Sequence, residues 1–290
     1  MLQALTSLSE YPWLLFAVTF IFGTLIGSFL NVVILRLPPR IMHEWRCQCR
    51  ELLETGEAEE PAPPGLVLAR SRCPGCGHQI SALENIPIIS YLFLRGKCSG
   101  CKQKISPRYL VVETLTGLAF ALVVWKFGIT EQALYALVFS GFLVAMSGID
   151  IDHQLLPDNL TLPLMWGGLL LSLNGTYTDP VSSLIGGAAG YLVLWLIYHL
   201  FKIATGKEGM GYGDFKLLAA IGACLGWQVL PQVILISSLV GAVTGIFMLL
   251  FNRNRKGEPI PFGPFLAAAG WIALIWGDQI RDAYSAYFGL

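Results

Sequence analysis

The chain has 290 residues, of which 54% are apolar and only 13% are charged. Soluble globular proteins carry about 25% charged residues, so this chain cannot cover a 31.7 kDa particle with solvated surface. Nineteen basic residues balance nineteen acidic ones, which excludes a generally basic nucleic-acid-binding protein. The composition indicates a polytopic membrane protein.

Continuous apolar runs predict an all-α membrane protein with about eight transmembrane helices. A helix needs ~20 apolar residues to cross ~30 Å of hydrocarbon, and a β-barrel would show alternating rather than continuous runs. The first run is too long for the core of a cleavable signal peptide, and no basic residue precedes it. The predicted spans are roughly 12–35, 109–126, 131–149, 159–174, 181–201, 215–229, 231–251 and 262–280.

The basic residues predict the orientation of these spans. Cytoplasmic loops carry an excess of Lys and Arg, and the stretch 36–108 alone holds 11 of the 19. If that stretch is cytoplasmic, alternate loops are cytoplasmic too. These loops carry Lys202, Lys207 and Lys216, and then Arg253, Arg255 and Lys256. Only Lys126 and Arg281 are then left on the other side. Both termini are therefore predicted to face away from the cytosol, in the periplasm.

The orientation divides the chain into three predicted parts. Residues 1–35 form the first transmembrane helix, 36–108 a cytoplasmic insert, and 109–290 a membrane domain of seven helices. The insert opens with Arg36-Leu37-Pro38-Pro39 and continues into an acidic, helical stretch. It breaks at the Pro- and Gly-rich segment 61–65. The acidic stretch is interpreted as a solvated face.

Two cysteine pairs in the insert predict a metal site. Cys73 and Cys76 are followed, after 21 intervening residues, by Cys98 and Cys101. Two such CxxC turns can close a tetrahedral site of four thiolates, for which zinc is the usual metal, and Gly75, Gly77 and Gly100 would supply permissive backbone there. With no ligand position left for water, the zinc would be structural. Disulfides are the alternative, but a reducing cytoplasm disfavours them.

Other possible metal ligands are assigned no role. His78 could compete for the ion, but four cysteines already satisfy it. Cys47, Cys49 and Cys224 have no evident partner and are interpreted as ordinary residues.

Two aspartates at the ends of predicted spans form a candidate catalytic pair. Asp150 follows the third span, and Asp214 precedes the sixth within Gly211-Tyr212-Gly213-Asp214; both are predicted at the cytoplasmic boundary. Two carboxylates that share a site hold one proton between them, so one can activate water while the other polarises a scissile carbonyl. The preceding glycines would let a substrate backbone approach. Helix capping by these aspartates is the alternative.

In chain order, these motifs resemble those of the bacterial type IV prepilin peptidases. The resemblance covers residues 20–280 and rests on Gly27–Val33 with Arg36-Leu37-Pro38, the paired CxxC, Glu84–Pro87, Asp150 with Leu155–Asp158, Glu208–Lys216 and Pro259–Pro264. It implies an inner-membrane aspartic protease of the GxGD class. Such a protease cleaves the basic leader of prepilins and pseudopilins after a glycine, on the cytoplasmic side.

Carried over to this sequence, the resemblance implies that Asp150 and Asp214 are the catalytic residues. Asp152 is the runner-up for Asp150, and Asp158 is interpreted as a helix cap. It also implies N-methylation of the new N-terminal residue with S-adenosylmethionine, although no residue can be assigned to that cofactor. Glu113 is predicted to be a buried carboxylate and is assigned to no site. The alternative is that Glu113 forms an ion pair with Arg108 or Lys216.

Two other functions remain open at this stage. One is a GxGD intramembrane protease without methyltransferase activity, which would place its aspartates mid-membrane rather than at a boundary. The other is a zinc-bearing membrane scaffold or transporter; transporters often contain internal repeats, and none is seen here. Apart from membrane lipid, the predicted partners are the prepilins and pseudopilins of pili or of a secretion system, with no nucleic acid.

Overall fold

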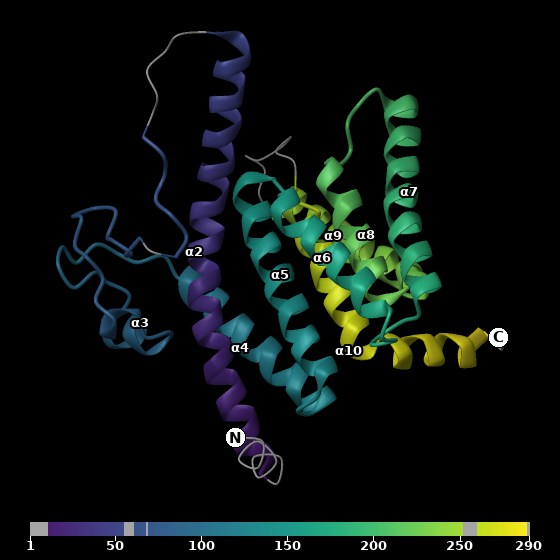
Figure 1. Cartoon of the computed structure of the whole chain (residues 1–290), viewed down its shortest axis with the longest axis horizontal. Helices are drawn as coiled ribbons and strands as arrows, with labels where there is room; N and C mark the ends of the chain where they lie inside the picture. Colours follow the sequence, from purple (N-terminus) through teal and green to yellow (C-terminus); the bar gives the residue numbers. More distant parts are fainter. Residues whose placement is uncertain (1–10, 55–60, 68, 252–259, 289–290) are drawn as a thin grey trace. The chain divides into compact units, whose positions relative to one another are not determined.

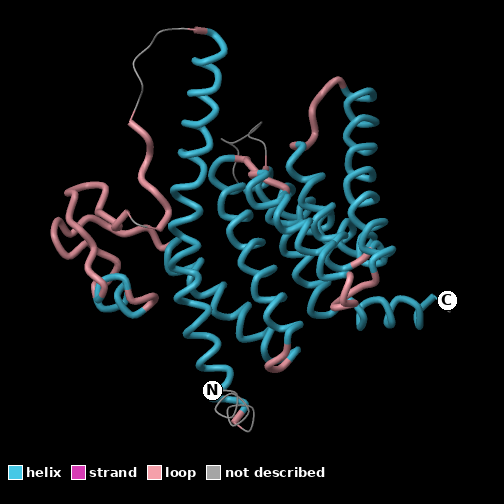
Figure 2. The backbone as a smooth tube through the Cα atoms, in the orientation of Figure 1, coloured by secondary structure: helices cyan, strands magenta, loops and turns pink. Residues whose placement is uncertain are grey.

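The computed structural model describes residues 11–54, 61–67, 69–251 and 260–288. Throughout these ranges helices joined by loops are found, with no β-strand beyond two isolated bridges, Arg72–Gln79 and Lys97–Lys104 (Figure 2). The predicted all-α class is confirmed. The chain forms two compact units, Met1–Ala145 and Met146–Leu290, with the division inside a helix. Each unit is described by itself.

The first unit is built on two long helices that pack closely together, α2 (Pro12–Leu53) and α4 (Arg108–Phe127) (Figure 1). A Cβ at Gly23 would lie 2.8 Å from the Cα of Gly117, and one at Gly27 would lie 2.8 Å from the Cα of Glu113. Glycines at such contacts let two membrane helices approach backbone to backbone. The described residues between α2 and α4 contain two short helices, η1 (Leu83–Asn85) and α3 (Ile89–Phe93), and α5 (Glu131–His153) follows α4.

Helix α2 extends well past the predicted end of the first span at residue 35. It continues through Pro38 and Pro39, which were predicted to lie at the opening of the cytoplasmic insert, and ends at Leu53. The part beyond the span is joined to the returning chain, because Arg36 donates to the carbonyl oxygens of Gly65 and Ala69 at 2.8 and 2.7 Å. The predicted acidic helix is therefore the end of α2, while Glu57, Glu59 and Glu60 lie outside the described residues.

The second unit surrounds one short, buried helix, α8 (Tyr212–Leu225). Nine of the fourteen residues of α8 are buried. Its neighbours are α6 (Asp158–Ser172), α7 (Pro180–Thr205) and α10 (Gly263–Phe288), and α9 (Leu230–Phe251) packs on α10 (Figure 1). A short turn, η2 (Trp227–Val229), joins α8 to α9. Helix α8 is thus the core of this unit.

Glycines allow α8 to approach its neighbours this closely. On the α7 side, a Cβ at Gly186 would lie 2.2 Å from the carbonyl oxygen of Gly222. On the α6 side, a Cβ at Gly168 would lie 2.7 Å from the sulfur of Cys224. On the α10 side, Gly270 makes room for the side chain of Ile221. On the α6 and α7 sides backbone packs on backbone, which leaves no room for side chains at Gly168 and Gly186.

Each of the eight predicted spans coincides with a helix of the described chain. In the described part of the chain, five helical segments are long and apolar enough to cross a membrane: Pro12–Leu53, Arg108–Phe127, Glu131–His153, Pro180–Thr205 and Trp227–Met248. Helices α6 and α8 have only 15 and 14 residues, about 22 Å at 1.5 Å per residue, which is short for ~30 Å of hydrocarbon. The chain is a polytopic membrane protein, and the count of eight spans stays a prediction.

Two adjacent glycines of α6 give a matched test of this packing. We expect Gly168→Ala to lower the free energy of unfolding by about 1–3 kcal/mol, because its methyl group would overlap Cys224. Gly167→Ala adds its methyl to open space and should leave stability unchanged or slightly raised, since alanine favours a helix. Thermal unfolding in detergent measures both, and an equal midpoint for the two variants would contradict the packing argument.

Candidate active site and candidate metal centre

Asp150 lies in the last turn of α5, within the second unit, and only 5% of it is exposed. Its Oδ2 accepts a hydrogen bond of 3.0 Å from the backbone N–H of Gly263, the first residue of α10. A Cβ at Gly263 would lie 2.7 Å from the same oxygen. Glycine at position 263 is therefore what allows the backbone of α10 to reach this carboxylate.

Asp214 is the third residue of α8 and is 6% exposed. Its Oδ2 accepts a hydrogen bond of 3.2 Å from the N–H of Gly211, which precedes the helix. This is one half of a capping box, and the other half is impossible because glycine has no side chain. The predicted capping role of Asp214 therefore exists, and it fixes the carboxylate at the helix entrance.

The two aspartates lie near each other within the second unit. Their carboxylates are close enough for the charge of Asp150 to act on Asp214, and Leu156 packs at the glycines that flank both. The chain leaves α5 through Gln154, which has a left-handed φ of 50°, and turns Leu156 back toward the site. A Cβ at Gly213 would lie 2.7 Å from Leu156, and one at Gly263 would lie 3.2 Å from it. Leucine 156 thus fills the space between the glycines that flank the two carboxylates.

The glycines before Asp214 have different roles from the one predicted. Gly213 was expected to admit a substrate backbone, but Leu156 already occupies the space where its side chain would be. Gly211 meets only its own loop, at 3.9 Å or more, so this position keeps the predicted openness. No role was predicted for Gly263, although Pro259–Pro264 was among the family motifs; Pro259 lies outside the described residues.

The other aspartates of the motif are not part of this arrangement. Asp152, the runner-up for Asp150, is exposed on the surface of α5. Asp158 was interpreted as a helix cap, but the capping residue of α6 is Pro157, and Asp158 is in the first turn of the helix. It forms an ion pair of 2.6 Å with Lys216. That pair removes Lys216 as the predicted alternative partner of Glu113.

The four predicted cysteines come together in the first unit. The Sγ atoms of Cys73, Cys76, Cys98 and Cys101 all lie within 4.8 Å of one another, and those of Cys73 and Cys101 are 3.8 Å apart. Zinc–thiolate bonds of about 2.3 Å in a tetrahedron place sulfurs about 3.8 Å apart. The donor set and its spacing fit a zinc ion.

Two equivalent hairpins present the cysteines. In one, Cys73 N–H donates to His78 and Gly77 N–H donates back to Cys73; in the other, Cys98 and Lys102 repeat both bonds at 2.9 and 3.0 Å. Gly77 and Lys102 both have left-handed φ values, 70° and 61°. The predicted need for glycine therefore holds at Gly77. It is wrong at Gly100, whose φ is not left-handed, while Gly75 instead makes room for the side chain of Gln103.

The segment that carries the cysteines has almost no core of its own. Among its described residues from 61 to 107 only Cys73, Pro87, Gly96 and Cys98 are buried, and two of these are the cysteines. Backbone N–H groups of Gly75 and Cys76 lower the pKa of Cys73 to about 7, which favours the thiolate that a metal binds.

His78 takes part in a hydrogen-bond network next to the cysteines. Its Nε2 lies 3.3 Å from Glu84 and 3.1 Å from the Ser99 hydroxyl. Hydrogen bonds from the Ser99 hydroxyl and the Ser81 backbone lower the pKa of Glu84 to about 2, so this carboxylate is ionised at neutral pH. Among the remaining cysteines, the half-buried Cys224 has its sulfur 3.6 Å from the Leu164 carbonyl oxygen, as expected for an ordinary residue.

Fold and site together define a polytopic membrane protein with a buried aspartate pair in one unit and a four-cysteine cluster in the other. Residues 21–127 match the bacterial peptidase A24 N-terminal domain, and residues 137–246 match the type IV leader peptidase family. The chain belongs to the type IV leader peptidase family and is an integral inner-membrane protein. The predicted resemblance is confirmed.

Relatives named prepilin leader peptidase/N-methyltransferase match nearly the whole chain. One from Stutzerimonas stutzeri is 56% identical over 91% of both chains, and one from Aeromonas hydrophila is 53% identical over 96% of both. One from Legionella pneumophila is 44% identical over 96% of this chain and 97% of its own. No solved structure matches.

Proposed function

We propose that the chain removes the basic leader of type IV prepilins and pseudopilins by cleaving after a glycine, with Asp150 and Asp214 as the catalytic residues. We further propose that it methylates the new N-terminal amine with S-adenosylmethionine. The observation that carries the peptidase is the burial of two neighbouring carboxylates at converging helix ends. The names of the relatives favour this function over an intramembrane protease without methyltransferase activity and over a scaffold or transporter.

The geometry suggests how the pair hydrolyses an amide bond. Two close carboxylates share one proton. The ionised aspartate takes a proton from water as the water oxygen attacks the carbonyl carbon, and the protonated aspartate donates to the carbonyl oxygen. Proton transfer to the amide nitrogen then releases the amine as the C–N bond breaks. The backbone bonds engage Oδ2 of Asp150 and of Asp214, so we assign Oδ1 of each to water and substrate.

We place this site on the cytoplasmic face. Asp158 at the start of α6 is paired with Lys216 near the start of α8, so both helix ends lie beside Asp214. Lys202, at the end of α7, contacts the Tyr198 ring, which packs on Tyr212. Lys202 and Lys216 are thus basic residues near the dyad end of these helices, which the positive-inside rule puts in the cytoplasm.

The proposed cofactors have different roles. Zinc bound by Cys73, Cys76, Cys98 and Cys101 is structural, because four thiolates leave no open position and the surrounding segment has almost no core. S-adenosylmethionine supplies an electrophilic methyl group for the amine. The dyad chemistry requires neither of them.

Substitution of the dyad tests the peptidase. We expect Asp150→Asn and Asp214→Asn each to lower kcat for cleavage of a model prepilin by at least about a hundredfold, because each removes a proton-transfer group. Asp152→Asn, an exposed neighbour on the same turn of helix, should cleave like the wild type. Product masses from detergent-solubilised enzyme give the readout. Full activity in either dyad variant, or its loss in Asp152→Asn, would place the chemistry elsewhere.

The close approach of Gly263 gives a second test. Gly263→Ala puts a methyl group 2.7 Å from the Asp150 carboxylate. We expect kcat to fall by roughly ten- to a hundredfold, since small displacements of catalytic groups cost this much, with KM little changed. Gly245→Ala on α9, whose Cβ would make only an ordinary contact at 3.6 Å, is the control. Equal kcat values for the two variants would show that the Gly263 contact has no bearing on catalysis.

Metal analysis tests the zinc centre. We expect about one zinc per chain in the wild type and none in Cys73→Ser/Cys98→Ser, whose folded yield should fall and whose segment 61–107 should become sensitive to protease. Cys49→Ser, at an exposed cysteine, should keep its zinc and its protease resistance. Wild-type protein purified without stoichiometric zinc would rule the site out.

A further inference from the structure

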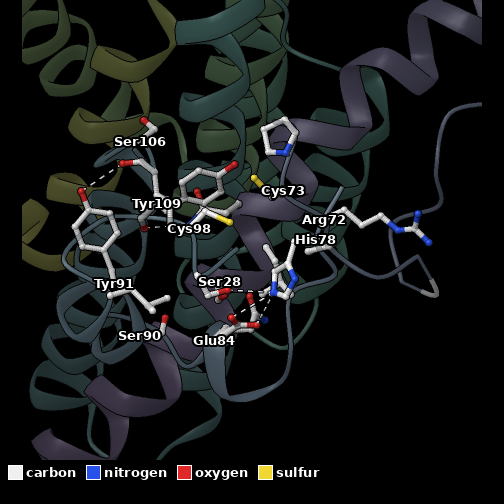
Figure 3. A pocket seen from close by; sticks show the side chains of 18 of the residues that line it. Ser28, Arg72, Cys73, His78, Glu84, Ser90, Tyr91, Cys98, Ser106 and Tyr109 are labelled. Carbon is white, nitrogen blue, oxygen red and sulfur yellow. Dashed lines mark hydrogen bonds and ion pairs between the residues drawn. The ribbon is translucent and has the colours of Figure 1, made fainter. Parts of the chain in front are cut away.

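A cavity of about 450 Å³ lies in the first unit, beside the cysteine cluster (Figure 3). This volume falls in the range of roughly 300–1,000 Å³ typical of cofactor and small-molecule sites. Its walls come from α2, from the start of α4, from η1 and α3, and from the two cysteine hairpins, which contribute Cys73 and Cys98. The peptidase dyad is in the other unit, so the mechanism proposed above makes no use of this cavity.

Polar contacts between the walls hold the cavity in shape. Glu113 of α4 accepts a hydrogen bond of 2.8 Å from the backbone N–H of Ile88, ahead of α3. Asn31 of α2 donates to the carbonyl oxygen of Tyr109 at 3.2 Å. Each contact joins segments far apart in the sequence, so the walls are fixed without a ligand. Such a preformed cavity is typical of a binding site.

Two of the charged groups that line the cavity, Glu113 and Arg36, are separated along α2; Arg72, Glu84 and Lys104 line it as well. Glu113 is only 8% exposed and packs at the Gly27 end, where a Cβ at Gly27 would touch its backbone. Arg36 lines the cavity from nine residues further along α2, two and a half turns or about 13.5 Å at 1.5 Å per residue. A carboxylate at one end and a guanidinium at the other suit an elongated ligand with hydroxyl groups or positive charge at one end and a carboxylate at the other.

Aromatic side chains add a surface for a flat ring. Tyr91 and Tyr109 both line the cavity (Figure 3), and Tyr109 is 36% exposed. Aromatic faces stack on nucleobases and attract cations. A nucleoside offers a base for the tyrosines and ribose hydroxyls for a buried carboxylate, an acceptor that nucleotide-binding folds also use.

We infer that this cavity binds the adenosyl amino acid that donates the methyl group, with Glu113 and Tyr109 contacting the nucleoside and Arg36 its carboxylate. The inference rests on the proposed methyltransferase function. Every residue that lines the cavity lies between 28 and 113, inside the stretch that matches the N-terminal domain and outside the stretch that matches the leader peptidase family. The relatives' names pair two activities, and the dyad accounts for one of them.

The transfer itself balances without another reactant. The N-terminal ammonium first loses a proton to solvent. The amine lone pair then forms an N–C bond to the methyl carbon as the C–S bond breaks and its electron pair returns to sulfur. The products are a secondary ammonium and the neutral thioether S-adenosylhomocysteine. An ionised Glu113 would balance the positive charge of the donor while it is bound.

Direct binding tests the inference on the full chain in detergent. Equilibrium dialysis with radiolabelled S-adenosylmethionine measures Kd for the wild type, Glu113→Gln, Tyr109→Leu and the control Glu131→Gln, an exposed glutamate at the start of α5 away from the cavity. We expect Kd to rise about tenfold or more in the two cavity variants, the effect of losing one good contact to a bound ligand, and to stay within about twofold in the control. Zinc content and unfolding midpoint verify each fold, and Tyr109→Leu, near the rim, keeps the test informative if Glu113→Gln unfolds.

The outcomes separate this inference from the proposed function. If the wild type binds the cofactor and adds a methyl group to cleaved prepilin, but both cavity variants bind as tightly as the wild type, the cavity assignment is wrong and the methyltransferase stands. If the wild type neither binds nor methylates while it still cleaves, both the methyltransferase and the cavity assignment are wrong. Loss of binding in the folded cavity variants alone supports the assignment.

Discussion

Two aspartate carboxylates are buried within reach of each other's charge, and each accepts a hydrogen bond from a single backbone N–H group. Burying an ionised carboxylate costs several kcal/mol unless hydrogen bonds compensate it, so those donors are a condition of the site. Both donors belong to glycines. At Gly263 the reason is steric, because any side chain there would meet the carboxylate it serves. The ends of α5, α8 and α10 therefore converge at one place in the second unit.

The same requirement extends into the packing of α8. Asp214 keeps its position at the start of α8 only if the helix itself is held in place. With 14 residues, α8 is too short to be anchored by spanning the membrane. It is fixed by backbone contact instead: Gly186 of α7 and Gly168 of α6 each bring a neighbouring backbone against it. Without glycines there, α6 and α7 would be forced outward and the helix entrance would lose its position. Gly168 and Gly186 thus help to hold the carboxylate of Asp214 in place.

The sequence was sufficient for the parts of the structure that follow from composition and local spacing. Continuous apolar runs predicted the helices, and the CxxC spacing predicted the cysteine cluster, because both patterns are local. The continuation of α2 beyond residue 35 was not predicted, because the apolar run ends there. The bonds that join Arg36 to the returning chain at Gly65 and Ala69 are long-range and leave no local pattern. The role of Gly263 was missed for the same reason: its partner is 113 residues away.

The spacing of glycines in the sequence does not reveal what each glycine does in the structure. Gly211 and Gly213 look equivalent in the sequence, yet one donates to Asp214 and the other makes room for Leu156. Lys102 occupies in the second cysteine hairpin the left-handed position that Gly77 occupies in the first. A permissive residue is therefore favoured at such a position but not required, because the surrounding hydrogen bonds can offset the strain.

The cysteine segment shows how a cavity can be built where there is almost no hydrophobic core. Only four of its described residues between 61 and 107 are buried, so apolar burial cannot hold the two hairpins together. Four thiolates around one ion would supply that link, since metal binding contributes directly to folding free energy. The buried pair, Cys73 and Cys98, also lines the cavity, so the same link fixes one of its walls. Loss of the metal would then weaken ligand binding in the first unit and leave the dyad of the second unit intact. The structural metal is therefore a requirement of the proposed methyltransferase activity and not of the proposed peptidase activity.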